Sequence, residues 1–199
     1  MNDELLVEDF VKELKATVPW LLAAAIAVGG YYGVKNYRAA RKAAASDAFV
    51  SAYTAEELEE AVAKYGSSDA GGALKLRLAK KYYDAGRYQE AQGLYAALSG
   101  SAAPDGYADI PAVGVAQCLE AQGSYAEALA GYDAFAAANP GSYLALTARL
   151  GAARSVAQAG DKDGALARLA EIKESVKGDK LAEARVEATE DCVRRYAKK

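Results

Sequence analysis

A repeat of 37 residues is the feature that most restricts how this chain can fold. The interval separates three glycines, and also three alanines that follow them: Gly86, Gly123 and Gly160, then Ala91, Ala128 and Ala165. A repeat of this length commonly forms one pair of helices, and a single pair cannot bury its apolar face alone. The repeat therefore predicts helix–turn–helix units, with a turn at each glycine, that stack side by side.

Other positions of the repeat are small or apolar in each copy. They are Ala79, Ala116 and Ala153, then Tyr82, Leu119 and Val156, then Tyr95, Tyr132 and Leu169, then Leu98, Phe135 and Ile172. Alanine where two helices cross lets their backbones approach, and the larger side chains fill the space to the next pair. Strand-like alternation of useful length is absent from the sequence, so we expect an all-helical protein.

A last helix, expected over about 180–197, continues the repeat by half a unit. Its apolar stripe would cover the end of the stack and consists of Ala182, Val186, Thr189, Val193 and Tyr196. Cys118 and Cys192 lie two repeats apart, which would separate them by roughly 20 Å if neighbouring helices are about 10 Å apart. We therefore expect two partly buried thiols with no disulfide between them, although intermolecular pairing stays open.

Residues 16–34 (ATVPWLLAAAIAVGGYYGV) have no formal charge. As a helix, this segment would be about 28 Å long, which matches the hydrocarbon core of a bilayer. Trp20 lies near one end and Tyr31 and Tyr32 near the other, as is typical of membrane interfaces, and Pro19 would fall in the first turn. The segment predicts one transmembrane helix.

A buried core helix and a cleaved signal peptide are the alternatives for this segment. A signal peptide begins with a basic region, whereas residues 1–15 contain five carboxylates against two lysines. We therefore expect an uncleaved anchor that follows a short acidic amphipathic segment. Ala25, Gly29 and Gly33 form a stripe of small residues along the anchor. The stripe would let another membrane helix approach closely, although small residues are common throughout this chain.

The helical pattern continues beyond residue 34 through a basic stretch to about Tyr53. Thr54 and Glu57 then have the spacing of a capping box, which predicts a helix from Glu56 to about Tyr65 that ends at Gly66. A run of carboxylates on this helix (Glu56, Glu57, Glu59 and Glu60) is expected to form a solvated face.

The repeats resemble the tetratricopeptide repeat, a helical pair with small residues at its crossing and aromatic residues in its second helix. The second copy fits best, through Ala116, Gly123, Tyr125, Ala128, Tyr132, Phe135 and Pro140. The usual tryptophan is absent and the third copy is weaker. The resemblance implies an α-solenoid of about three helix pairs and a capping helix. We therefore divide the chain into an acidic segment (1–15), a transmembrane helix (16–34), juxtamembrane helices and a linker (35–71), and a tetratricopeptide repeat domain (72–199).

The whole layout is similar to the YfgM-like ancillary subunits of the bacterial SecYEG translocon. The similarity includes FVKELK in the acidic segment, the basic exit VKNYRAARKAAASDAF and the repeat opening ALKLRLAKKYYDAGRYQEA. It implies a single-pass inner-membrane protein with its N-terminus in the cytoplasm and its repeats in the periplasm. It also implies translocon subunits and periplasmic chaperones or their clients as partners. Four basic residues follow the apolar segment and two precede it, so the positive-inside rule favours the opposite orientation.

Composition excludes several classes of function. The chain has no histidine, which removes imidazole bases and the commonest ligand of transition metals. Phosphate-binding glycine motifs are absent from the sequence, so we expect neither an enzyme nor a cofactor or metal. A formal net charge of −3 argues against a nucleic-acid partner.

In tetratricopeptide repeats, ligands usually lie on the concave face that the first helices form. The resemblance places six residues there: Lys80, Tyr83, Gln117, Glu120, Arg154 and Gln158. Polar side chains interleaved with tyrosine would suit an extended peptide, although an empty solvated groove fits equally well. We expect a membrane-anchored adaptor that binds proteins. An envelope or cell-division scaffold is the alternative, and self-association stays open.

Overall fold

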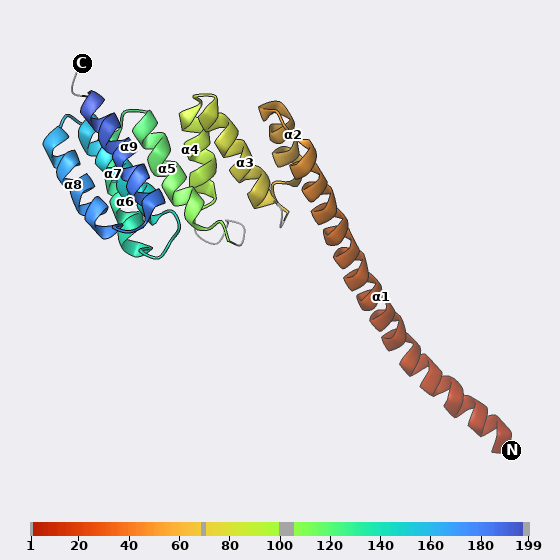
Figure 1. Cartoon of the computed structure of the whole chain (residues 1–199). Helices are drawn as coiled ribbons and strands as arrows, with labels where there is room; N and C mark the ends of the chain where they lie inside the picture. The colour runs from red at the N-terminus through yellow and green to blue at the C-terminus, as the bar shows by residue number, and fades with distance from the viewer. Residues whose placement is uncertain (1, 69–70, 100–105, 197–199) are drawn as a thin grey trace.

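The computed structural model describes residues 2–68, 71–99 and 106–196, with side chains from residue 17 onward. Within these ranges all regular secondary structure is α-helical, which confirms the prediction of an all-helical protein. A long N-terminal helix leads into a row of shorter helices, in which each helix packs against the next along the chain (Figure 1). We refer to this row, α2 to α9, as the helix stack.

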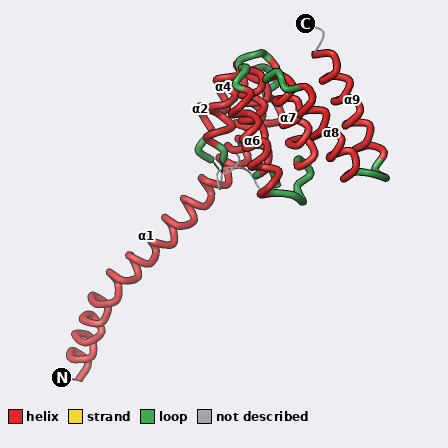
Figure 2. The backbone as a smooth tube through the Cα atoms, turned by 90° about the vertical axis from the view of Figure 1, so that its left-hand side faces the viewer, coloured by secondary structure: helices red, strands yellow, loops and turns green. Residues whose placement is uncertain are grey.

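Helix α1 (Asn2–Ser51) projects from the helix stack as a single rod (Figure 2). The part from Thr17 to Ser51 is long and apolar enough to cross a membrane, and its most apolar stretch is not covered by the rest of the described chain. One N-terminal helix of this kind agrees with the prediction, but the expected place of Pro19 was wrong. Pro19 lies inside α1, since the helix already begins at Asn2. The missing N–H at Pro19 removes one backbone hydrogen bond from the helix interior.

The C-terminal end of α1 packs against α2 (Ala55–Tyr65) and α3 (Gly71–Asp84). Ala45, Ala52 and Leu58 are buried together in the core at this junction. α1 ends here instead of continuing because Thr54 starts a new helix with a capping box, as predicted. The Glu57 N–H donates to Thr54 Oγ1 at 3.1 Å, and the Thr54 N–H donates to Glu57 Oε2 at 3.0 Å.

The remaining helices are α4 (Tyr88–Ala97), α5 (Asp109–Ala121), α6 (Tyr125–Ala138), α7 (Ala145–Gln158), α8 (Lys162–Ser175) and α9 (Lys180–Tyr196). Three of their connections contain the predicted glycines. Gly86, Gly123 and Gly160 have φ angles of 77°, 84° and 103°, in the left-handed region that glycine adopts without steric cost. The next N–H after each glycine returns to the preceding helix, as from Arg87 to the Tyr82 carbonyl at 2.8 Å. This geometry terminates a helix and satisfies its last carbonyl groups.

The repeated apolar positions form the core of the helix stack. The six repeat alanines at the crossings are at most 1% exposed: Ala79, Ala116, Ala153, Ala91, Ala128 and Ala165. The larger residues of the second helices are buried as well: Tyr95, Tyr132, Leu169, Leu98, Phe135 and Ile172. Burial differs among the three copies at the repeat position of Tyr82, Leu119 and Val156. Tyr82 is buried, whereas Leu119 and Val156 are only half-buried.

Helix α9 covers the end of the helix stack against α7 and α8. Ala182, Val186, Thr189 and Val193 are buried on its inner face, as predicted. The prediction was wrong for Tyr196, which is 44% exposed in the last turn of α9. Its phenol oxygen accepts a hydrogen bond from Gln158, so this side chain remains at the polar surface and not in the core.

Candidate functional site: a polar cluster on the helix stack

Three of the six residues expected on the binding face meet around one carboxylate. Glu120 lies on α5, while Arg154 and Gln158 lie one turn apart on α7. The Arg154 guanidinium binds Glu120 in a two-pronged manner, with Nε 2.9 Å from Oε1 and Nη2 2.9 Å from Oε2. Gln158 Nε2 donates to Glu120 Oε1 at 3.3 Å. The carboxylate therefore connects two helices that belong to neighbouring pairs.

Two tyrosines complete this group, and sequence analysis missed the role of both. The Tyr132 hydroxyl donates to Glu120 Oε2 at 2.8 Å, and Gln158 Nε2 donates to the Tyr196 hydroxyl at 3.1 Å. We call these five residues, Glu120, Tyr132, Arg154, Gln158 and Tyr196, the Glu120 cluster. Tyr132 was expected only as a core residue. Its repeat spacing gave no signal that its hydroxyl would reach a carboxylate on α5.

The Glu120 cluster is largely shielded from water. The Glu120 side chain is 10% exposed and that of Arg154 is 28% exposed. Burial together with the charge of Glu120 raises the pKa of Tyr132, so its hydroxyl remains a proton donor at neutral pH. Burial lowers the pKa of Arg154, but the hydrogen bonds to Glu120 and the negative charge of Glu120 together outweigh this effect, and the net shift of the pKa is upward. The Arg154 guanidinium is therefore held opposite the Glu120 carboxylate by two charge-assisted hydrogen bonds.

A shallow hollow of about 470 Å³ lies beside the cluster. Its lining includes Glu120, Gln158 and Tyr196 from the cluster, together with Ala121, Tyr125, Ala157 and Gly160. Carboxylate, amide and phenol groups thus border apolar surface at the ends of α5, α7 and α9. A surface of this kind suits hydrogen bonds to a peptide backbone together with contact to an apolar side chain.

The other three predicted residues lie at different distances from this cluster. Burial and the charge of Glu120 raise the pKa of Tyr83, so Tyr83 lies close enough to the cluster to sense its charge. Gln117 is half-buried on α5, one turn before Glu120. Lys80 instead lies on the exposed side of α3, where its Nζ is 2.7 Å from Asp84 Oδ1. The structure therefore brings together Glu120, Arg154 and Gln158, with Tyr83 nearby.

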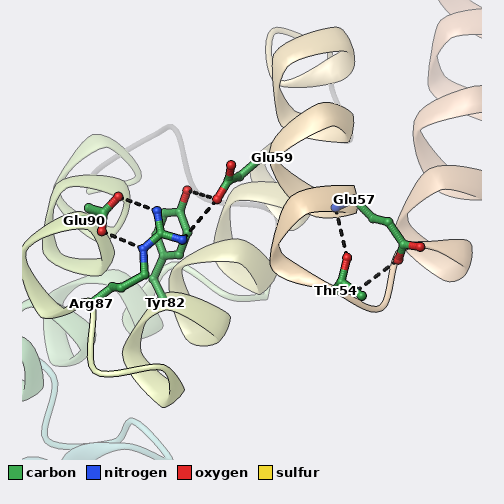
Figure 3. A network of polar contacts seen from close by, with 6 residues as sticks. All are labelled: Thr54, Glu57, Glu59, Tyr82, Arg87 and Glu90. Carbon is green, nitrogen blue, oxygen red and sulfur yellow. Dashed lines mark hydrogen bonds and ion pairs between the residues drawn. The ribbon is translucent and has the colours of Figure 1, made fainter.

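A second polar network links α2 to the turn between α3 and α4 (Figure 3). Arg87 lies between Glu59 and Glu90, with Nη1 3.2 Å from Glu59 and Nη2 2.6 Å from Glu90. Its guanidinium carbon is 4.0 Å from the centre of the Tyr82 ring, and the Tyr82 hydroxyl donates to Glu59 at 2.8 Å. The Glu59 side chain is still 42% exposed, in agreement with a solvated acidic face on α2, but an arginine 28 residues later in the chain also binds it, which the sequence did not predict.

The remaining sequence-derived sites lie outside these networks. Ala25, Gly29 and Gly33 are exposed on α1, and a Cβ added at either glycine would meet nothing within 4 Å. Cys118 is buried and Cys192 half-buried, and both are free thiols. Across the described ranges, no group of three cysteine, aspartate or glutamate side chains is placed to hold a metal ion.

Comparison with known proteins adds no assignment to this geometry. The chain matches no protein-family model, no curated protein and no solved structure.

Proposed function

We propose that the protein is a membrane-anchored adaptor whose helix stack is a tetratricopeptide-repeat solenoid that binds other proteins. The observation that supports this most is the continuity of α1. An uncovered apolar helix runs without a break into the packed helices, so a membrane anchor and a surface of helix pairs belong to one chain. A chain built this way holds a protein-binding surface at a membrane.

The repeat assignment is supported by the equivalence of successive pairs. Each of the three pairs has a buried alanine on both of its helices, a left-handed glycine between them and a large buried residue on the second helix. These are the features by which the second copy resembles a tetratricopeptide repeat. Helix pairs of this kind expose a long surface and commonly serve protein recognition.

The binding surface that we propose is the face bearing Lys80, Tyr83, Gln117, Glu120, Arg154 and Gln158. Glu120, Arg154 and Gln158 lie together beside a hollow, and their mutual bonds hold the side chains in defined positions. Preorganised polar groups next to apolar surface favour binding of an extended peptide, since fewer side-chain rotamers are lost on association.

As compartment we propose the bacterial inner membrane, with α1 as a single span and the helix stack in the periplasm. Translocon subunits would contact the stripe of Ala25, Gly29 and Gly33, and periplasmic chaperones or their clients would contact the helix stack. This part depends on the similarity to YfgM-like translocon subunits. The four basic residues after the span favour the opposite orientation, so topology is the first property to test.

Protease digestion of spheroplasts tests the orientation. We expect protease added outside the inner membrane to degrade the helix stack while α1 stays membrane-bound. A protected helix stack would contradict both the periplasmic placement and the chaperone partners.

Site-specific photocrosslinking tests the adaptor role. A photocrosslinking amino acid at Gly29 should capture translocon subunits, and one at Gln158 should capture soluble envelope proteins. The matched control is Ala134, which is exposed on α6 and does not line the hollow beside the Glu120 cluster. Equal products from Gln158 and Ala134 would contradict a binding face, and enrichment of a labelled chain at midcell would favour the scaffold alternative.

A further inference from the structure

A second hollow, of about 370 Å³, lies where α1 approaches the end of α2. It is lined by Tyr37, Arg38 and Arg41 of α1 and by Ser67 and Ser68, which follow α2. We call it the basic hollow. Two guanidinium groups, the Tyr37 phenol and the Ser67 hydroxyl are donors that suit a phosphate group.

Contacts within the basic hollow hold its walls in place. Arg41 lies 5.9 Å from the centre of the Tyr37 ring, and its Nη1 donates to the Tyr37 hydroxyl at 3.3 Å. Arg41 Nη2 donates to the Lys64 carbonyl, which fixes α1 against α2. Ser68 Oγ donates to the Tyr65 carbonyl at 2.6 Å and fixes the turn. A guanidinium has five N–H donors, so Arg41 keeps donors for a ligand.

Further positive charge surrounds the basic hollow. Lys35 and Lys42 belong to the same stretch of α1. Lys75 reaches over from α3, where its Cε lies 3.3 Å from the position that a Cβ on Gly66 would occupy. Side chains from α1 and α3 thus bring cations to both sides of the turn after α2, which favours an anion there.

The height of the basic hollow along α1 matches the lipid head-group layer. Tyr37 and Arg41 lie three and seven residues after Val34, which ends the uncharged segment. At about 1.5 Å per residue, they lie about 5–10 Å beyond it. The head-group layer of one leaflet is about 5–8 Å thick. Side chains on a helix lean toward its N-terminus, so those of Arg38 and Arg41 incline toward the membrane.

We propose that the basic hollow binds the phosphate of an anionic lipid in the leaflet that faces the helix stack. The proposal rests on the membrane anchor of the proposed function. A lipid is the source, because α1 holds the hollow at the membrane surface, where lipid phosphates far outnumber those in solution. Binding there would fix the tilt and rotation of the helix stack relative to the bilayer.

Native mass spectrometry of the full chain tests the site. The protein is kept in detergent micelles with equal amounts of phosphatidylglycerol and phosphatidylcholine that have the same acyl chains. We expect the native chain to retain phosphatidylglycerol in roughly thirtyfold excess, since each of the two arginines near the head group contributes about one kcal/mol. Equal retention of the two lipids would overturn the proposal.

Charge-removal variants assign the preference to the basic hollow. Arg38→Gln with Arg41→Gln should abolish the preference, whereas Arg194→Gln with Arg195→Gln removes the same charge from α9 and should preserve it. Arg38→Gln alone leaves the Arg41 contact with α2 intact and should lower the preference about fivefold. A preference that survives the double change at 38 and 41 would overturn the assignment.

Two further measurements distinguish a lipid from a soluble anion as the ligand, and failure of the site from failure of the membrane anchor. Displacement of phosphatidylglycerol by an equal concentration of inorganic phosphate would assign the hollow to a soluble anion and overturn the lipid proposal. Fluorescence quenching of Trp20 by chain-brominated phosphatidylcholine in vesicles reports whether α1 enters the bilayer, independently of any head group. Quenched Trp20 without a lipid preference would refute the site alone, whereas unquenched Trp20 would refute the anchor and the site together.

Discussion

Tyr95 and Tyr132 each lie with the ring directly on the backbone of a glycine in the next helix. A Cβ added at Gly114 would lie 2.8 Å from the Tyr95 ring, and one added at Gly151 would lie 2.5 Å from Cζ of Tyr132. Gly114 and Gly151 are also one repeat apart, although neither was among the predicted repeat positions. Glycine is needed at both positions because no side chain fits between the ring and the helix.

Gly151→Ala should therefore destabilise the helix stack by about 1–3 kcal/mol, because the added methyl forces the Tyr132 ring or α7 to shift. Gly93→Ala on α4 is the matched control, since nothing lies within 4 Å of its added Cβ. Alanine there should be neutral or stabilise by up to about 1 kcal/mol through helix propensity. Thermal unfolding of the full chain in detergent, followed by circular dichroism, measures both. Similar shifts for the two variants would contradict the close contact.

Cys118 should react slowly with thiol reagents at neutral pH. Burial raises the pKa of Cys118 from 9.0 to about 11, because the thiolate loses its hydration. At pH 8 only about one thiol in a thousand is ionised, and labelling should rise with pH until about 11. Because the pKa of Cys118 is higher in the folded protein, the protonated thiol contributes to folding stability. This contribution is fully present below pH 9 and is lost as the pH rises toward 11.

Iodoacetamide labelling followed by peptide mass spectrometry measures the reactivity of each cysteine. The half-buried Cys192 serves as the internal reference and should be labelled first at pH 8. Equal labelling of the two cysteines in the folded protein would show that Cys118 is not buried.

At the scale of helices, the Glu120 cluster connects α5, α6 and α7 through a charged pair that is mostly removed from water. Breaking such a pair leaves an uncompensated charge in the protein. Glu120→Gln and Arg154→Met should each destabilise by about 2–4 kcal/mol, and the double variant should lose less than the sum. A double-mutant cycle by urea unfolding should give a coupling energy of about 1–3 kcal/mol.

The pair of Arg168 and Asp133 is the matched control for this cycle. It joins α8 to α6 with N–O distances of 2.9 and 3.0 Å, but its side chains are 41% and 44% exposed. Solvent screening should reduce its coupling to about 0.2–1 kcal/mol. A coupling at Glu120 no larger than that at Asp133 would show that burial does not strengthen the first pair.

At the scale of the whole molecule, α1 and the helix stack are joined by more than a peptide linker. The Arg77 guanidinium on α3 lies 5.2 Å from the centre of the Phe49 ring and 5.6 Å from that of Tyr53, and it donates to the Phe49 carbonyl. Together with the buried Ala45 and Leu58, these contacts fix the direction in which the rod leaves the helix stack (Figure 1).

Arg77→Ala should loosen this junction without unfolding either part. We expect backbone amides over 45–51 to exchange with deuterium about fivefold faster, as a loss of about 1 kcal/mol of docking energy implies. Arg149→Ala is the control, because Arg149 bonds Ser175 at the far end of the helix stack. Unchanged exchange over 45–51 in the Arg77 variant would show that the apolar contacts alone hold α1.

Local signals explain why much of the helix stack was predictable. Gly86, Gly123 and Gly160 end helices through their own backbone conformation, and the capping box at Thr54 acts within three residues. Pro19 and Tyr196 were misplaced because each depends on its neighbours. The position of Pro19 within its helix depends on whether the acidic segment joins the apolar one. The position of Tyr196 depends on Gln158, its hydrogen-bond partner 38 residues earlier.

Periodicity and capping act over a few residues, so the helices, the three glycine turns and most of the buried positions could be derived from the sequence alone. The folded molecule alone shows that Glu120 meets Arg154, that Arg87 meets Glu59 and that two tyrosines lie on glycines. Each of these contacts depends on the rotation and spacing of helices in different pairs. Those quantities follow from the packing of whole helix faces and are not encoded at any single repeat position.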